Sequence, residues 1–507
     1  MAQVTVQSGG YVTVPGAGTL NMTLQNQIAA AILAAATTPS ARLFTATVPA
    51  SPGPSVPAAP GYATVSEGLV TDAGGNAFSF NSGYNYVLNN ATGIDTITVA
   101  PDTGIISGTV GGAFNLTGGD TVALGGGNNT VQSASVSAFP ALDYVAAGGG
   151  NDVISEAIGG TIAGGGGANL LSGSSTAGSL LIISSGAGDT VNAMSASGVT
   201  VQSSGTNTTI NTDSVDAGSS LYVQDTGTAT TLNGGNLGPE TISAQGSSLS
   251  AAAGSGNLLF LGGAGLANLS GVAGTAESIV GGSGTLIYSD QGANASVTGG
   301  SGHFVGFGGD GGTINYSSSI GSAALIALGG NETLNAAGAS VGVQLVGADS
   351  MFGVPQPTND VLIGGSGADT FIAGNGNATM TGGAGDNIFA FFKTASVNSV
   401  AYSIGGGNTV ITDFNARTRF SPRGTAPRPR PRRSRRRRSA AAIPPSPCPT
   451  IPGSPSTVSA VPARWPDTSI RSADPLPAAP GSTVRAAVSF SGAAGIFAIT
   501  RRTVPGG

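Results

Sequence analysis

Histidine and cysteine are almost missing from the chain, and this limits the chemistry that it can carry. His303 is the only histidine and Cys448 the only cysteine among 507 residues. A Ser–His–Asp triad would have to use His303, which stands where a turn enters a strand and is expected to be solvated or at the edge of the core rather than a general base. A zinc site needs three or four His, Cys or carboxylate ligands. A single cysteine also excludes a disulfide framework.

Aromatic and charged residues are scarce, and glycine takes their place. Aromatic residues make up 5% and charged residues 8% of the chain, whereas 85 residues are glycine. Such a composition cannot build one thick globular core. Short apolar runs, for example Leu180–Ile183 and Leu258–Leu261, recur between Gly-rich turns. Short strands between frequent turns predict an all-β solenoid.

Long hydrophobic runs are also missing. The N-terminus has no basic flank followed by a long apolar segment, so we expect no secretory signal peptide. The apolar stretch 28–36 is too short to span a membrane, so we expect no transmembrane segment.

Basic residues are missing from most of the chain. Only Arg42 and Lys393 precede Ala416, whereas 22 of the 24 acidic residues do. Two basic against 22 acidic residues give the body a charge of −20, and 16 basic against two acidic residues give the tail +14. A body with this charge and few large apolar side chains is expected to be poorly compact without cations.

Four consecutive nine-residue blocks lie between Pro355 and Ala390. Gly364–Ile372 fits the pattern Gly-Gly-x-Gly-x-Asp-x-apolar-x at every specified position, and Gly382–Ala390 fits it with Asn in place of Asp. The glycines let the backbone turn its carbonyls toward one point, and the Asp adds an anionic oxygen. Calcium prefers six to eight such oxygens. The eighth residue of each block is apolar and is expected to point inward: Leu362, Phe371, Met380 and Phe389.

This pattern resembles the RTX, or hemolysin-type, calcium-binding nonapeptide repeat. The resemblance implies a parallel β-roll in which turns two blocks apart share an edge. Asp360 would then face the Gly374/Gly376 turn, and Asp369 the Gly383/Gly385 turn. Ala378 removes one carboxylate, so the calcium array is expected to be short. The implied metal-site residues are Asp360, Gly365, Gly367, Asp369, Gly374, Gly376, Gly383, Gly385, Asp386 and Asn387.

Degenerate copies of the block extend the repeat upstream. They occur at 124–131, 148–154 and 164–171, and their turns carry mostly Asn. Asn tolerates the left-handed conformation and bonds its own backbone, so stacked Asn turns stabilise a β-helix without metal. We therefore predict a right-handed parallel β-solenoid that ends in an RTX-like β-roll. The predicted parts are a small N-terminal strand and helix module (1–45), a Pro-rich linker (46–62), a degenerate solenoid (63–350), the calcium-binding β-roll (351–415) and a disordered tail (416–507).

The tail invites a nucleic-acid interpretation, because Arg428–Arg438 is rich in arginine. We favour a reading-frame shift instead. The composition changes abruptly after Asn415, and a shifted frame permits the continuation of Ile411–Asn415 that commonly follows RTX-like repeats. The arginine run would then be a by-product, so no nucleic-acid partner is expected.

Two classes of function follow. The first is a secreted, non-enzymatic calcium-binding protein of the bacterial surface or matrix, acting in adhesion, biofilm or a surface layer, with extracellular polysaccharide or other surface proteins as partners. The resemblance implies type I export, which needs no N-terminal signal peptide. The alternative is a secreted effector or polysaccharide-active enzyme, for which Asp213 with Asp216, or Asp349 with Asp360, are candidate carboxylate pairs.

Overall fold

The computed structural model of the chain describes its central part almost continuously and its two ends in pieces. The described residues are 2–5, 11–14, 23, 26–32, 34, 43–48, 56–61, 63, 65–80, 83–134, 142–157, 159–174, 178–194, 198–214, 219–235, 238–348, 359–374, 376–392, 395–397, 400–402, 408–413, 419–423, 484–490 and 497–503.

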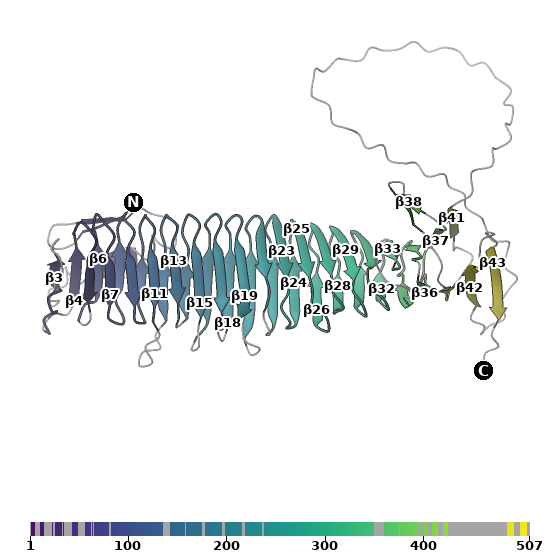
Figure 1. Cartoon of the computed structure of the whole chain (residues 1–507), viewed down its shortest axis with the longest axis horizontal. Coiled ribbons are helices and arrows are strands. Elements are labelled where there is room, and N and C mark those ends of the chain that lie inside the picture. The colour runs from purple at the N-terminus through teal and green to yellow at the C-terminus, as the bar shows by residue number, and fades with distance from the viewer. Residues whose placement is uncertain are drawn as a thin grey trace, which may run out of the picture.

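The described residues form a parallel β-solenoid of about 16 turns, which is elongated along the stacking direction (Figure 1). Each coil gives one strand to each of two parallel sheets. The first sheet runs through β3 (Leu43–Val48), β4 (Val65–Val70), β6 (Tyr86–Asn89), β8 (Gly104–Ser107), β10 (Thr121–Ala123), β12 (Asp143–Ala146), β14 (Gly160–Ala163), β16 (Leu180–Ser184), β18 (Gly198–Ser203), β20 (Ser220–Asp225), β22 (Glu240–Ala244), β24 (Leu258–Gly262), β26 (Ala276–Val280), β28 (Asn294–Thr298), β30 (Thr313–Ser318), β32 (Thr333–Ala339), β34 (Asn359–Ile363), β36 (Asn377–Thr381) and β40 (Thr409–Ile411).

The second sheet lies opposite the first across the core. It runs through β5 (Ala77–Phe80), β7 (Thr96–Val99), β9 (Ala113–Leu116), β11 (Thr130–Ser133), β13 (Val153–Glu156), β15 (Leu170–Ser174), β17 (Thr190–Met194), β19 (Thr209–Ser214), β21 (Thr230–Asn233), β23 (Ser248–Ala252), β25 (Leu266–Ser270), β27 (Thr285–Ser289), β29 (His303–Gly308), β31 (Ser322–Ala327), β33 (Val343–Val346), β35 (Thr370–Ile372), β37 (Ile388–Phe392) and β41 (Arg419–Arg423). We call the turns that lead from the first sheet to the second edge A, and those that lead back edge B.

The nine-residue block is half a coil, as predicted. Leu362 pairs with Met380 in the first sheet and Phe371 with Phe389 in the second, each 18 residues apart. All four side chains are buried, which confirms that they point inward. The Phe371 and Phe389 rings stack with centroids 4.6 Å apart. Columns of equivalent side chains thus supply the core that a chain with few aromatics could not build otherwise.

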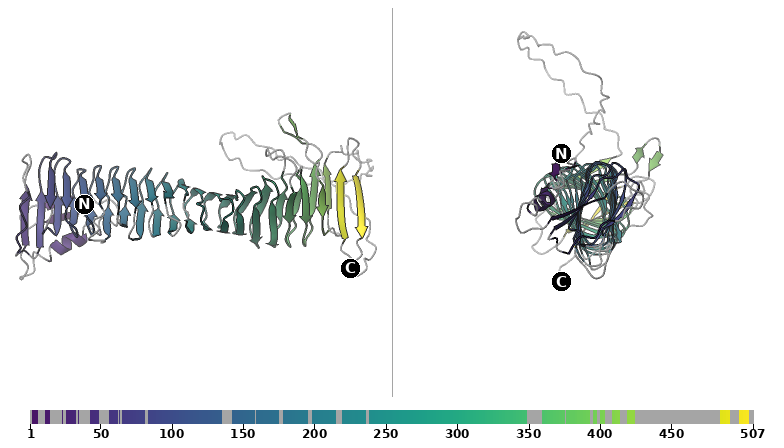
Figure 2. Two further views of the ribbon diagram at one scale, coloured as in Figure 1. Left: turned by 60° about the horizontal axis from the view of Figure 1, so that its bottom comes forward. Right: turned by 90° about the vertical axis from the view of Figure 1, so that its left-hand side faces the viewer.

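The predicted N-terminal strands and helix are present in the described residues. β1 (Ala2–Thr5) and β2 (Tyr11–Val14) pair antiparallel, and residues 26–32 are helical. Ile28 and Ile32 of the helix pack with Leu69, Leu88 and Ile106, which face outward from the first sheet. The helix therefore covers one outer face of the first coils (Figure 2).

Strand pairing extends beyond two of the predicted domain boundaries. β3 pairs parallel with β4, so the stack begins inside the predicted N-terminal module and linker. At the other end β41 pairs parallel with β37, and β42 (Val484–Phe490) pairs antiparallel with β40 and with β43 (Phe497–Thr503). The open end of a parallel stack presents unpaired N–H and C=O groups that an extended segment can join, which accounts for these pairings. The rest of the tail lies outside the described residues.

The antiparallel pair β38 (Ala395–Val397) and β39 (Val400–Tyr402) stands apart from the two main sheets. No helix in the described part of the chain is both long and apolar enough to cross a membrane. The right-handed winding of the coils stays a prediction.

Candidate metal centre

Edge A of the repeat segment brings Asp369 and Asn387 together. Asp369 is buried just before β35, and Asn387 is buried in the equivalent place before β37. The Asp369 N–H donates to Asn387 Oδ1 at 2.9 Å. The Asp369 carboxylate accepts the N–H of Val343, one coil earlier, and the N–H of Gly365 in its own turn, both at 2.8 Å. Each sixth-place residue thus links its own turn to the turn of the preceding coil.

The glycines of these turns are required by backbone contact between coils. A Cβ on Gly383 would lie 2.2 Å from the Gly365 carbonyl oxygen, and one on Gly385 would lie 2.1 Å from that of Gly367. Gly383 and Gly385 also have positive φ values of 75° and 87°. The predicted stacking of turns two blocks apart is therefore confirmed, and it places carbonyl oxygens of one coil against the glycines of the next.

Edge B holds Asp360, whose carboxylate points back along the stack. Asp360 is in register with Ala378, and a Cβ on Gly374 would lie 1.8 Å from the Ala348 carbonyl oxygen, so the described parts of these two edge B turns stack on each other. However, the Asp360 carboxylate accepts the N–H of Ala348 at 2.8 Å and that of Glu332 at 3.4 Å. Ala348 follows β33, 12 residues before Asp360, whereas Glu332 lies one coil earlier, so Asp360 links its own turn to the preceding coil as Asp369 does. Among the other predicted metal-site residues, Gly374 and Gly376 are buried and Asp386 is exposed.

Asp413 is a site residue that the sequence reasoning missed. Its two carboxylate oxygens accept the N–H groups of Gly382 and Gly383, each at 2.7 Å. Asp413 therefore caps the last glycine turn of the repeats from the coil above. It lies 30 residues after Gly383, outside the nine-residue register, so spacing gave no signal for it.

The same arrangement continues upstream without the full motif. Asn129, Asp152, Asn169 and Asp189 are buried at equivalent places on edge A. The N–H of each of the first three donates to the side-chain oxygen of the next, at 2.8–2.9 Å. The predicted stacking of Asn turns is confirmed, but its cause differs from the prediction. Glycines such as Gly127, Gly150 and Gly167 take the positive φ, while Asn and Asp cap the backbone of the preceding coil.

The donor set of the repeat segment suits a hard cation. Burial raises the pKa of Asp369, and the N–H groups of Val343 and Gly365 lower it in part. Carboxylate, carboxamide and carbonyl oxygens are the ligands that calcium prefers. The described residues contain no group of three acidic, His or Cys side chains that could hold a metal alone. Calcium bound here would be held by Asp369, Asn387 and turn carbonyls together with water, and its positive charge would offset the buried carboxylate.

The structure describes only some of the residues considered for catalysis, and both candidate carboxylate pairs stay a prediction. His303 is exposed at the start of β29, as predicted, and its Nδ1 lies 2.7 Å from Ser322 Oγ. The side chain of Asp213, and Asp216 and Asp349, lie outside the described residues. Asp360 is buried in the turn described above.

The comparison with known families agrees with the geometry. Residues 357–389 match the family model of the RTX calcium-binding nonapeptide repeat, in four copies. No curated protein and no solved structure matches the chain. The segment therefore carries repeats of the RTX calcium-binding type, and these nonapeptides form late coils of a longer parallel β-solenoid.

Proposed function

We propose that this chain is a secreted, non-enzymatic calcium-binding protein of the cell surface or matrix, whose long solenoid is the binding surface. The observation that carries the proposal is that the turns and the outer faces of the sheets carry different side chains. The acidic side chains that cap the turns are buried and hold the coils together, whereas the outer faces of the sheets carry uncharged polar side chains.

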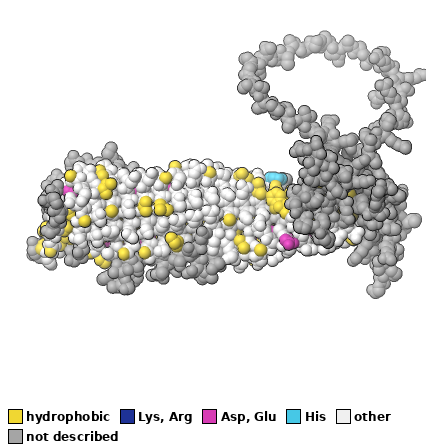
Figure 3. All heavy atoms as spheres, in the orientation of Figure 1, with side chains coloured by type: hydrophobic (Ala, Val, Ile, Leu, Met, Phe, Trp, Pro, Cys, Tyr) yellow, Lys and Arg dark blue, Asp and Glu magenta, His cyan; other side chains and the backbone are white. Residues whose placement is uncertain are grey.

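The outer faces form regular polar rows. Asn192, Asn211 and Asn233 stand on neighbouring strands of the second sheet. The Asn211 Nδ2 donates to Asn192 Oδ1 and the Asn233 Nδ2 to Asn211 Oδ1, both at 2.9 Å. Asn331, Asn359 and Asn377 repeat this pattern at 3.1 Å beside the first sheet. Figure 3 shows that the described surface on this face is mostly uncharged, with small scattered apolar patches. A rigid, uncharged, hydrogen-bonding surface fits partners such as neutral polysaccharide or another protein surface.

Calcium has a folding role in this proposal. An ion that binds the folded turns and not the unfolded chain stabilises the fold by mass action. The −20 body would then stay loose at low calcium and become compact where calcium is plentiful. Such a chain suits export in a loose state and folding outside the cell, as RTX-type proteins are typically exported.

Binding and turnover measurements test the proposal. The purified full chain, with 10 mM calcium or with a chelator, would be immobilised and exposed to neutral polysaccharides, acidic polysaccharides and whole cells. We expect retention that depends on calcium, without release of reducing ends. Sustained release of reducing ends would favour the alternative, a polysaccharide-active enzyme. Absence of retention on every surface would remove the adhesive role.

A further inference from the structure

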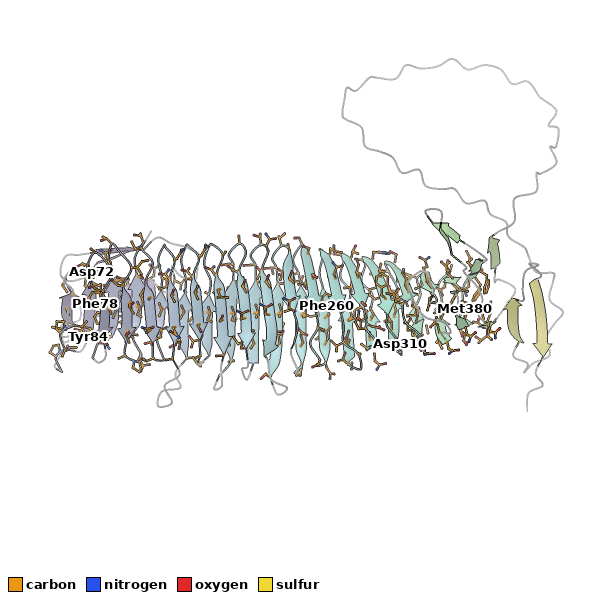
Figure 4. The ribbon with its side chains drawn as sticks, viewed as in Figure 1. Asp72, Phe78, Tyr84, Phe260, Asp310 and Met380 are labelled. Carbon is orange, nitrogen blue, oxygen red and sulfur yellow. The ribbon has the colours of Figure 1, made fainter. Side chains whose placement is uncertain are left out.

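A group of acidic residues lies on edge B, before the matched repeats. Asp290 follows β27, Asp310 lies in the turn after β29, and Glu332 precedes β32. The turns that surround them are rich in glycine, at Gly308–Gly312 and Gly329–Gly330. Asp310 is exposed at the rim of the solenoid (Figure 4), whereas Asp290 and Glu332 are fully buried.

Asp290 and Glu332 each use one carboxylate oxygen and leave the other without a partner. Asp290 Oδ1 accepts the N–H groups of Gly292 and Gly309, and Glu332 Oε1 accepts the N–H of Gly329. Asp290 Oδ2 and Glu332 Oε2 are buried and have no hydrogen-bond partner in the described structure. A buried carboxylate oxygen without a partner is costly, so something else is expected to satisfy these two.

The two carboxylates meet at the same backbone segment. Asp290 bonds the N–H of Gly309, and a Cβ on Gly308 would lie 3.0 Å from Glu332 Oε2. A Cβ on Gly312 would lie 2.5 Å from Asp290 Oδ2. Glycine at these positions therefore leaves space beside each partnerless oxygen, at Gly308 for Glu332 Oε2 and at Gly312 for Asp290 Oδ2.

Within the residues that the structure describes, no cationic side chain pairs with these two carboxylates. The sequence has no Lys or Arg between Arg42 and Lys393, and the only histidine, His303, begins β29 and is exposed there. Asp310 and Asp360 add negative charge nearby and raise the pKa of Glu332 further. Negative charge thus gathers at a dry, glycine-lined turn that has backbone carbonyls and one exposed carboxylate at its opening.

We propose that Asp290 Oδ2 and Glu332 Oε2 bind a divalent cation, calcium by their chemistry, at a site separate from the nonapeptide repeats. All available donors are oxygens, and the remaining ligands would be turn carbonyls and water. Calcium accepts such a mixed and irregular shell, whereas magnesium demands a near-octahedral one. Asp310 stands where an incoming cation would first meet the protein. The competing explanation is that the two carboxyl groups are simply protonated.

Calcium stoichiometry of the full chain tests the site. Equilibrium dialysis with calcium would compare the parent chain, the double variant Asp290→Asn/Glu332→Gln, the repeat variant Asp369→Ala, and Glu240→Gln as a control. Glu240 is also buried with a partnerless oxygen but lies in β22, several coils away. We expect the double variant to lose about one ion per chain relative to the parent, also in the Asp369→Ala background, and Glu240→Gln to lose none.

The outcomes separate this site from the repeats. An unchanged stoichiometry in the double variant, with a loss in Asp369→Ala, would overturn the proposed site and leave the protonated pair. A loss only in the double variant would support the new site and contradict calcium binding at Asp369. If the double variant does not fold, hydrogen exchange of the parent decides. Calcium should slow exchange of peptides covering 308–332, and unchanged exchange there contradicts the site.

Discussion

The coils before residue 348 and the nonapeptide coils after residue 359 share one architecture and differ in their turns. Both have inward apolar columns and a capping residue on edge A. In the repeats the coil length is 18 residues, while upstream it varies, for example 17 from Ile154 to Leu171 and 23 from Val131 to Ile154. The parallel stack therefore needs the inward column and the cap, and tolerates different lengths of turn between them.

The comparison also separates capping from calcium binding. Asn129 and Asp152 cap the preceding coil in the same way as Asn387 and Asp369 do. A carboxylate at this place is thus explained by backbone hydrogen bonds alone. What the repeats add is two consecutive turns with the full glycine pattern, which bring carbonyl oxygens around the carboxylate.

The inward column is the shared feature, and its removal should have the largest effect. Phe371→Ala is expected to lower the free energy of unfolding by about 3–5 kcal/mol, because it leaves a cavity below the stacked Phe389 ring. Chemical denaturation measures the loss. Thr379→Ala, on the exposed side of β36, is the matched control and should change stability little. An equal effect of both would contradict the inward column.

Buried carboxyl groups that bind no calcium should make the stability of the upstream coils depend on pH. Burial raises the pKa of Glu240 from 4.5 to about 7, and the nearby Glu277 adds to this. Between these values the folded state holds a proton that the unfolded chain has released, so stability is full below about pH 4.5 and falls as pH rises toward 7. Glu240→Gln should therefore stabilise the chain at pH 8, by up to about 3 kcal/mol, and have little effect at pH 4.5.

The control for this prediction is Asp102→Asn, which changes an exposed carboxylate. Thermal unfolding in a chelator at pH 4.5 and pH 8 gives the comparison. A stabilisation by Glu240→Gln that is the same at both pH values would show that the carboxyl group does not titrate in this range.

Calcium should stabilise the nonapeptide coils more than the upstream coils. At 10 mM calcium, about 1–3 kcal/mol of stabilisation is expected for a site with a Kd of roughly 10⁻⁴–10⁻³ M. Asp369→Ala should remove more of this gain than Asp152→Ala, because only Asp369 lies in a fully matching block. Both variants lose backbone caps, so the decisive quantity is the difference in unfolding free energy with and without calcium. Equal calcium gains in the two variants would leave capping as the only role of Asp369.

The outer Asn rows should contribute least to stability. Asn211→Ala removes two side-chain hydrogen bonds at a partly exposed position. A loss of about 0.5–1 kcal/mol is expected from denaturation, since water replaces the missing partners. If these rows form the binding face, Asn211→Ala should also bind clearly less well than the parent chain to the polysaccharides or cells that the parent binds. A change in stability without a change in retention would place the binding face elsewhere.

The sequence predicted the periodic parts of this structure but not the residues and strands at the two ends of the stack. The spacing of Leu362, Phe371, Met380 and Phe389 identified the inward columns, because each block repeats the same local geometry. Asp413 was missed because its partners lie one coil away across a break in the register. The start of the stack at β3 was missed for a similar reason, since strand pairing across a Pro-rich segment leaves no periodic signal.

The caps give the solenoid a direction. Each described cap on edge A accepts an N–H group from the coil before it, so a cut across the stack would leave these capped N–H groups bare on one face and the cap oxygens bare on the other. Asp413 covers the donors of Gly382 and Gly383 at the C-terminal side. Two cut faces would be complementary to each other, and a fragment from the middle of the solenoid, lacking such a cover, would be expected to polymerise head to tail into filaments.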